Sequence, residues 1–144
     1  MAGYAAKALG YLSMQNGTPQ QVREIAERTR IPAPYLAKIV HQLGRKGIVR
    51  TRRGVGGGVE LAVDANRMTL YELCEAIEDP VLEAQCLLGL GRCGDDCACP
   101  AHDFSKTLRK QKLEFLRRTT LADVGRYEEA RRNGRSARRG RRKR

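Results

Sequence analysis

The sequence contains no tryptophan, and five tyrosines and two phenylalanines are the only aromatic residues among its 144. It has no apolar run near the ~18–20 residues that a membrane-spanning helix requires, so no membrane partner is expected. The N-terminus lacks the charged region, apolar stretch and small-residue cleavage site of a secretory signal, which predicts a cytoplasmic protein. No Ser–His–Asp set or pair of carboxylates resembles an active site, and we predict that the chain is not an enzyme.

The positive charge is concentrated at the C-terminal end. The net charge is +12, and residues 126–144 hold ten Arg or Lys against two Glu, which leaves +4 for the preceding 125 residues. We expect residues 126–144 to be a disordered Arg-rich tail. A polyanion would bind such a segment through counterion release, without sequence preference. The alternative is a solvated tail that only keeps the protein in solution.

Apolar residues at helical spacing predict three helices in the first part of the chain. The first covers residues 4–15. A cap at Thr18, followed by proline and then by glutamine at the third helical position, predicts the start of a short second helix. The third runs from about residue 34 to residue 45. Its apolar face consists of Leu36, Ile39, Val40 and Leu43.

Two β-prone segments follow, residues 48–51 and 59–63, and the glycine-rich loop between them predicts a hairpin. The loop lacks the Gly-Lys-Ser/Thr ending of a phosphate-binding loop, which disfavours a nucleotide site. Helix, short helix, helix with a polar outer face and basic hairpin, in this order, is the layout of a winged helix-turn-helix. The predicted fold class is therefore mainly α with a small β-hairpin wing, and residues 1–66 form the DNA-binding domain.

The second half predicts two more helices on either side of a cysteine-rich loop. Thr69 and Glu72 have the spacing of a capping box, which starts a helix. Residues 86–100 are rich in glycine and aspartate and predict a loop, and residues 102–118 predict a longer helix. Apolar residues lie on more than one face of that helix, so it is expected to pack on its own domain and on a partner chain. Residues 67–125 form the predicted second unit.

The polar outer face of the third helix and the basic hairpin predict a surface for double-stranded DNA. In a helix-turn-helix the second helix lies in the major groove with its N-terminal residues facing the bases. Arginine beside glycine in a hairpin is suited to a narrow minor groove. The candidate DNA-binding residues are Ala33, Pro34, Tyr35, Lys38 and His41 on the helix and Arg52, Arg53, Gly56 and Gly57 on the hairpin.

Several of these segments resemble one known family. Residues 25–28, 31–39, 47–49, 53–58 and 68–70 look like the Rrf2 family of transcription regulators (the IscR/NsrR/BadM type), and the resemblance extends from about Tyr4 to Val124. It implies a homodimer of paired winged helices, joined through the long helix, that binds a roughly palindromic DNA site. It also implies a sequence-specific regulator, whether repressor or activator.

Four of the five cysteines lie within fourteen residues, which indicates metal or redox chemistry rather than disulfides. The family resemblance implies that Cys86, Cys93 and Cys99 hold an iron–sulphur cluster (2Fe-2S or 4Fe-4S), with His102 as fourth ligand. The cluster would make DNA binding respond to redox state, nitric oxide or iron. Cys97 is an additional thiol that could replace Cys99 or His102.

Three alternatives remain open at this loop. A tetrahedral zinc site with three cysteines and one histidine uses the same donors. The loop could instead hold no metal and act through its thiols, or could be purely structural. A thiol-dependent enzyme using Cys97 or Cys99 is the least favoured reading, because no motif positions a general base. The fifth cysteine, Cys74, lies on an apolar stripe and is expected in the core.

Overall fold

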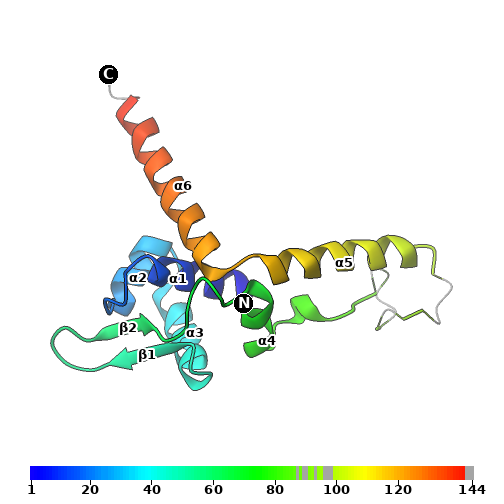
Figure 1. Ribbon diagram of the computed structural model, residues 1–144, viewed down its shortest axis with the longest axis horizontal. Coiled ribbons are helices and arrows are strands. Elements are labelled where there is room, and N and C mark those ends of the chain that lie inside the picture. The colour runs from blue at the N-terminus through cyan, green and yellow to red at the C-terminus, as the bar shows by residue number, and fades with distance from the viewer. Residues whose placement is uncertain (87, 89–90, 93, 96–98, 142–144) are drawn as a thin grey trace.

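The computed structural model describes the backbone of residues 1–86, 88, 91–92, 94–95 and 99–141 (Figure 1). The helices of the first half and the hairpin form the body, and the long helices of the second half leave it in different directions (Figure 1). The elements are α1 (Ala2–Ser13), α2 (Val22–Thr29), α3 (Ala33–Arg45), β1 (Val49–Arg52), β2 (Gly58–Leu61), α4 (Leu70–Ala76), the 3₁₀ turn η1 (Pro80–Leu82), α5 (His102–Arg118) and α6 (Leu121–Arg141). The predicted fold class, mainly α with a β-hairpin wing, is confirmed.

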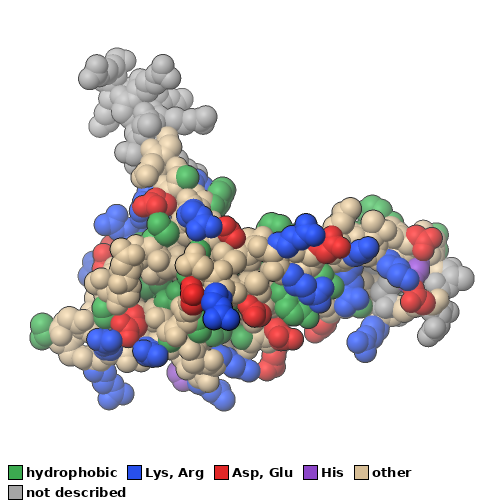
Figure 2. Space-filling view, viewed as in Figure 1, with side chains coloured by type: hydrophobic (Ala, Val, Ile, Leu, Met, Phe, Trp, Pro, Cys, Tyr) green, Lys and Arg blue, Asp and Glu red, His purple; other side chains and the backbone are tan. Residues whose placement is uncertain are grey.

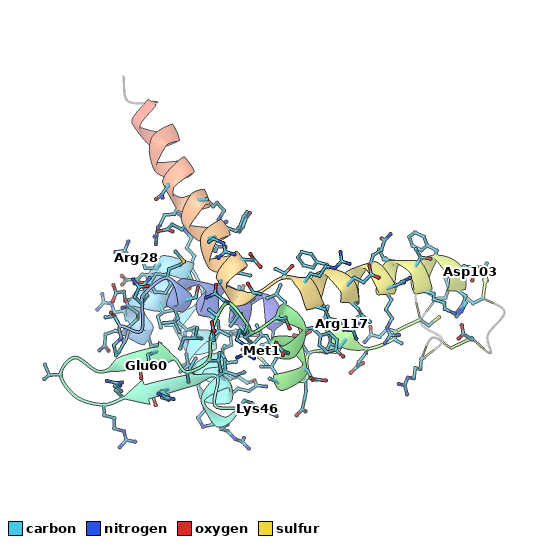
Figure 3. All side chains as sticks on the ribbon, in the orientation of Figure 1. Met1, Arg28, Lys46, Glu60, Asp103 and Arg117 are labelled. Carbon is cyan, nitrogen blue, oxygen red and sulfur yellow. The ribbon has the colours of Figure 1, made fainter. Side chains whose placement is uncertain are left out.

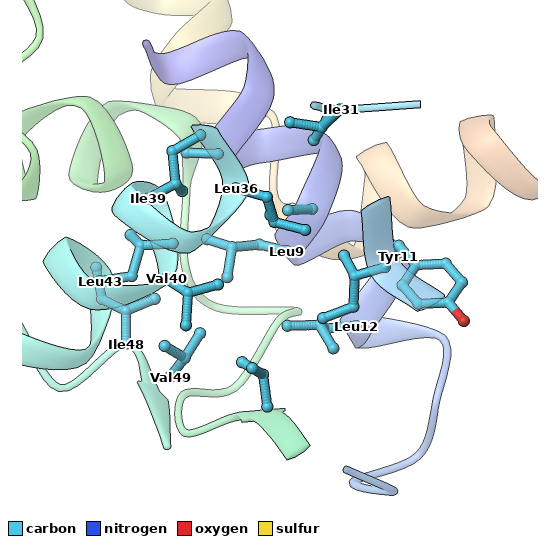
Figure 4. Close-up of a cluster of buried hydrophobic side chains, with 14 of the residues drawn as sticks. Leu9, Tyr11, Leu12, Ile31, Leu36, Ile39, Val40, Leu43, Ile48 and Val49 are labelled. Carbon is cyan, nitrogen blue, oxygen red and sulfur yellow. The ribbon is translucent and has the colours of Figure 1, made fainter. Parts of the chain in front are cut away.

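The core lies between α1, α2 and α3 and is closed by the hairpin (Figure 4). The four apolar positions predicted for α3 are all buried, which leaves its polar side facing outward. Leu73 of α4 and Leu121 of α6 belong to the same cluster as Leu9 of α1. The core therefore includes residues from both sides of position 66.

The start of α2 differs from the sequence expectation. Its N-cap is Gln21, not Thr18, because Gln20 pairs in an antiparallel bridge with Val59 of β2. The Gln20 N–H donates to the Val59 carbonyl at 2.9 Å, and the Val59 N–H donates back at 2.8 Å. These buried backbone hydrogen bonds hold residue 20 extended, so the helix cannot begin earlier. The hairpin is thereby fixed to the helix-turn-helix.

The hairpin strands pair antiparallel, with Val49 opposite Leu61 and Arg52 opposite Gly58. Gly58 has φ +152°, and a Cβ there would lie 2.6 Å from the Gln20 carbonyl oxygen. A side chain at this position would break the bridge to Gln20, so the close approach requires glycine.

The predicted capping box at the start of α4 is confirmed. The Thr69 hydroxyl accepts from the Glu72 N–H at 3.2 Å, and the Glu72 carboxylate accepts from the Thr69 N–H at 2.7 Å. The predicted helix over residues 102–118 is also confirmed as α5. Its last turn packs on α4, where Leu116 is buried and the Arg117 guanidinium lies 4.5 Å from the centre of the Tyr71 ring.

Residues 126–141 are helical, whereas the sequence predicted a disordered tail. α6 starts at a second capping box, in which the Thr120 N–H donates to the Asp123 carboxylate at 2.9 Å and the Asp123 N–H donates to the Thr120 hydroxyl at 3.2 Å. Its first turns pack on α1, where a Cβ on Gly10 would come within 3.0 Å of the Gly125 nitrogen. The cap and this close packing start a helix that then continues into the Arg-rich segment. No helix among the described residues is both long and apolar enough to span a membrane.

Candidate nucleic-acid interface and cysteine loop

The outer face of α3 carries all five predicted helix residues at the surface. Every one of Ala33, Pro34, Tyr35, Lys38 and His41 is exposed. They face outward because the opposite side of α3 supplies the buried residues of the core. The N-terminal turn of the helix is therefore free to approach a groove, with a cation and an imidazole one and two turns further on.

Tyr35 is supported from α1. Its ring meets the ring of Tyr4 edge to face, with the centroids 5.6 Å apart and the planes at 75°. Both side chains are still partly exposed, Tyr35 at 47%. Such aromatic pairs restrict ring orientation in addition to burying area. Sequence reasoning did not identify this contact of Tyr4.

On the hairpin, Arg52, Arg53 and Gly56 are exposed, and Gly56 adopts φ +75°. Gly57 differs from these, since it is buried and its carbonyl accepts from the Gln21 Nε2 at 2.5 Å. A Cβ on Gly57 would also collide with the Arg52 carbonyl. Gly57 thus sits inside the turn, where it shapes the hairpin, and the other three lie on its surface.

A groove between α3 and the hairpin joins the two sets of residues. Its lining includes His41 and Arg45 from α3 and Arg50, Arg52 and Glu60 from the hairpin. Figure 2 shows Lys and Arg side chains gathered on the edge of the molecule formed by α3 and the hairpin. The charged side chains that line the groove are three arginines and one glutamate, and this excess of positive charge favours phosphates.

Glu60 is the functional residue that sequence reasoning missed. It lies on β2 beside the groove (Figure 3), and its side chain is only 7% exposed. The carboxylate accepts from the Arg52 Nε at 3.1 Å and pairs with the same guanidinium at 3.0 Å. The signal in the sequence was a single acid between Val59 and Leu61, in a strand whose partner carries arginines. A carboxylate in such a strand indicates a cross-strand ion pair.

Two of the predicted metal ligands lie in the described part of the cysteine loop. Cys86 and Cys99 are half-buried. The Cys86 N–H donates to the Gly91 carbonyl at 2.9 Å, and Gln85 forms an antiparallel bridge with Arg92. The Ala101 N–H donates to the Cys99 sulphur at 3.4 Å, just before α5 begins. Cys93, and the additional thiol of Cys97, lie outside the described residues.

His102 is the first residue of α5, and its Nε2 lies 3.0 Å from an Asp95 carboxylate oxygen. The Lys106 ammonium donates to the same oxygen at 2.6 Å. The hydrogen bonds from Lys106 and His102 lower the pKa of Asp95. Among the described residues, no three His, Cys, Asp or Glu side chains are arranged to hold a metal ion. Cys74 is buried as expected, and burial raises the pKa of its thiol.

A helix-turn-helix with a paired wing and a basic outer face defines a winged-helix DNA-binding protein. The chain belongs to the Rrf2 family, whose description is "Iron-dependent Transcriptional regulator" and which it matches over residues 1–127. It is a DNA-binding transcriptional regulator and not an enzyme.

Relatives of known description support this assignment. The chain is 34% identical over 128 residues to an HTH-type transcriptional regulator of Aquifex aeolicus, covering 88% of this chain and 89% of that protein. It is 30% identical over 122 residues to the HTH-type transcriptional regulator IscR of Klebsiella pneumoniae, covering 84% and 74% of the two chains.

Solved structures show the same fold. CymR (YrzC), the global cysteine regulator of B. subtilis, superposes with a TM-score of 0.69 at 23% identity, covering 88% of this chain and 93% of that one. IscR of T. potens gives a TM-score of 0.65 at 23% identity, with 85% and 81% covered. At these identities the likeness concerns the fold alone.

Proposed function

We propose that α3 enters the DNA major groove and that the hairpin reaches the adjacent minor groove. The exposed face of α3 and the hairpin arginines lie on one edge of the molecule, beside a groove lined by Arg45, Arg50 and Arg52. This single arrangement carries the proposal. Lys38 would contact bases or phosphates, Arg53 would enter the minor groove, and Pro34 and Tyr35 would meet thymine methyls or the sugar–phosphate backbone.

Binding to DNA selected from a random pool by the full-length protein tests this proposal. Lys38→Ala and Arg53→Ala should each lower affinity by about 1–3 kcal/mol. Lys110→Ala removes an equally exposed charge from α5 and serves as the control. Equal affinities for all four proteins would refute the assignment of this edge.

We also propose that α5 joins two copies of the chain. Phe104, Leu108 and Phe115 are 64%, 54% and 59% exposed, and they fall at i, i+4 and i+11 on the helix. Residues at this spacing share a face, so α5 presents an apolar stripe on the side away from α4. A second copy of the stripe would cover it in a two-fold dimer, which pairs two winged helices for a palindromic site.

We further propose that Cys86, Cys93 and Cys99, with His102, hold an iron–sulphur cluster that controls DNA binding. The described donors fit such a group, since two are thiols and the third is an imidazole at the start of α5. An N–H bond to a ligating sulphur, such as that from Ala101 to Cys99, tunes the potential of a bound cluster. The description of the family as iron-dependent supports iron. Zinc on the same donors is the second candidate.

The loop residues link this site to the rest of the protein. Asp95 orients His102 and also pairs with Lys106, so the loop is fastened to the first turn of α5. A bound cluster would supply one-electron chemistry and reactivity toward nitric oxide. A change in its ligands would then alter the position of α5, which carries the proposed dimer face.

Anaerobic purification with a visible spectrum and iron and sulphide analysis tests the metal proposal. We expect a brown protein containing iron and sulphide, and a colourless Cys93→Ala variant. Cys74→Ser is the control, because Cys74 is buried in the core and is not part of the loop. A colourless wild-type protein that contains zinc would support the second candidate, and one with no metal would refute both.

A further inference from the structure

The last part of α6 has no counterpart in the family match. Residues 131–141, hereafter the basic arm, hold six arginines and no Asp or Glu. α6 extends to Arg141, but the match to the Rrf2 family ends at residue 127. Whatever the basic arm does is therefore additional to the winged helix that this chain shares with its relatives.

The sequence places few acids near the basic arm. Glu128 pairs with Arg131 at 2.8 Å, and both side chains are half-buried. Glu129 is the last acid in the sequence, so no carboxylate within the arm is available to the arginines that follow. Arg131, Arg135, Arg138 and Arg139 recur at helical spacings of three and four, where like charges repel. A polyanion would relieve this repulsion and stabilise the helix.

The direction of the basic arm is set at the base of α6. Leu121, Ala122 and Gly125 are buried, and Gly125 lies against Gly10 and Ser13 of α1. From there the helix leaves the body on the side away from α3 and the hairpin (Figure 1). Its described part beyond Arg131 extends about 15 Å further. A straight duplex bound to α3 and the hairpin therefore lies on the other side of the body from the basic arm.

We propose that the basic arm binds the phosphates of a second DNA duplex, so that the protein bridges two DNA segments. This rests on the proposed binding of the first duplex by α3 and the hairpin. Arginine contacts to phosphates release counterions and need no particular sequence. A second DNA segment is the favoured polyanion, because the first duplex already holds the protein where DNA is concentrated.

A two-duplex capture experiment with the full-length chain tests the bridging. One short duplex is immobilised and an identical fluorescent duplex is added with the protein, and the retained fluorescence is measured. Two variants change the same four positions, Arg135, Arg138, Arg139 and Arg141, to Gln or to Lys. The Lys variant is the matched control, since phosphate attraction depends on charge.

We expect the wild type and the Lys variant to retain the fluorescent duplex. The Gln variant should lose retention to the level without protein, while still binding a single duplex. Circular dichroism on heating should show that DNA stabilises helix in the wild type more than in the Gln variant. Retention by the Gln variant equal to that of the wild type would overturn the proposal.

Two other results would also overturn it. If the wild type does not bridge and the Gln substitutions flatten the salt dependence of binding to one duplex, the arm contacts the same duplex as α3. If an RNA duplex releases the fluorescent DNA at concentrations that leave the first duplex bound, the arm is an RNA site.

A third variant distinguishes a failure of the bridging proposal from a failure of the proposed binding by α3 and the hairpin. Lys38→Ala combined with Arg53→Ala leaves the basic arm intact, so it should bind one duplex weakly and should not bridge. If this variant bridges as well as the wild type, α3 and the hairpin are not the first site. If only the Gln variant then loses bridging, the basic arm is required for bridging but α3 and the hairpin are not.

Discussion

Arg52 and Glu60 form an ion pair across the hairpin, with the Arg52 guanidinium 3.0 Å from the Glu60 carboxylate. The Glu60 side chain is 7% exposed and the Arg52 side chain is 64% exposed. The acid is thus held within the groove beside α3, and the arginine covers it from the solvent side. Changes to this ion pair should therefore affect both the stability of the hairpin and the positive charge of the hairpin surface proposed to bind DNA.

Removal of the arginine should cost more stability than neutralisation of the acid. Arg52→Met keeps an apolar stem but leaves a buried carboxylate without its ion pair, and it should lower the free energy of unfolding by about 1 kcal/mol. Glu60→Gln should cost less, because the amide oxygen still accepts from Arg52. The double variant should lose less than the sum of the two single losses. Urea unfolding of the four proteins measures this, and additive losses would contradict the coupling.

Glu60→Gln should at the same time bind DNA more tightly. The change removes a negative charge beside the rim of the groove and releases Arg52 toward phosphate. We expect a gain of about 0.5–1 kcal/mol and a salt dependence steeper by about one phosphate contact. Titration of duplex DNA at several salt concentrations measures both. A weaker complex would show instead that the ion pair positions Arg52 for binding.

The contact between α6 and α1 predicts opposite effects at two glycines of the same helix. A Cβ on Gly125 would lie 2.7 Å from the Gly10 carbonyl and 2.5 Å from the Ser13 hydroxyl, so Gly125→Ala should lower stability by about 1–3 kcal/mol. Gly134 has open space around it, and Gly134→Ala should raise helix stability by about 0.5–1 kcal/mol. Thermal unfolding followed by circular dichroism compares the two. A Gly125→Ala variant as stable as the wild type would exclude the close packing of α6 on α1.

Acid should weaken the cap of α4. Hydrogen bonds from the Thr69 N–H and hydroxyl to the carboxylate lower the pKa of Glu72. The ionised Glu72 side chain therefore stabilises the fold fully at pH values above its ordinary pKa of 4.5. This stabilisation is lost as the pH falls through the lower pKa that Glu72 has in the folded protein. Glu72→Gln should be less stable than the wild type at neutral pH, and the difference should shrink in acid. Melting temperatures at neutral and acidic pH measure this, and a difference independent of pH would contradict it.

The proposed dimer predicts that the same substitution has different effects on the oligomeric state at two adjacent residues of α5. Leu108 lies on the exposed apolar stripe, so Leu108→Lys should give a folded monomer. Thr107→Lys adds the same charge to an exposed residue that projects about 100° around the helix from Leu108, and it should leave the dimer intact. Sedimentation of both variants measures the oligomeric state. A monomeric wild type, or a dimer unaffected by Leu108→Lys, would remove α5 from the interface.

Local patterns were sufficient for much of this fold. The face of α3 was predictable because Leu36, Ile39 and Leu43 recur at the helical period. The start of α4 was predictable because Thr69 and Glu72 bond to each other within one turn. The capping box of Thr120 and Asp123 carried the same kind of signal, which was not used to predict α6. The exposed positions of Lys38 and Arg53 followed from these elements.

Other features depend on contacts between segments distant in sequence. Thr18 offered a local helix cap, but the bridge between Gln20 and Val59 prevented its use. The burial of Glu60 requires the hairpin to lie against α3, and the course of α6 requires Gly125 to meet Gly10. None of these partners is visible in a local window of sequence.

The sequence by itself therefore determined the elements from α1 to α5, the apolar face of α3, the charge of the basic arm and the family. Those properties follow from side-chain spacing and from hydrogen bonds within a single turn. Only the tertiary structure decided where α2 begins, that Arg52 covers a buried Glu60, and that α6 leaves the body away from α3. These outcomes depend on which surfaces meet, because burial and backbone pairing between distant segments outweigh local preferences.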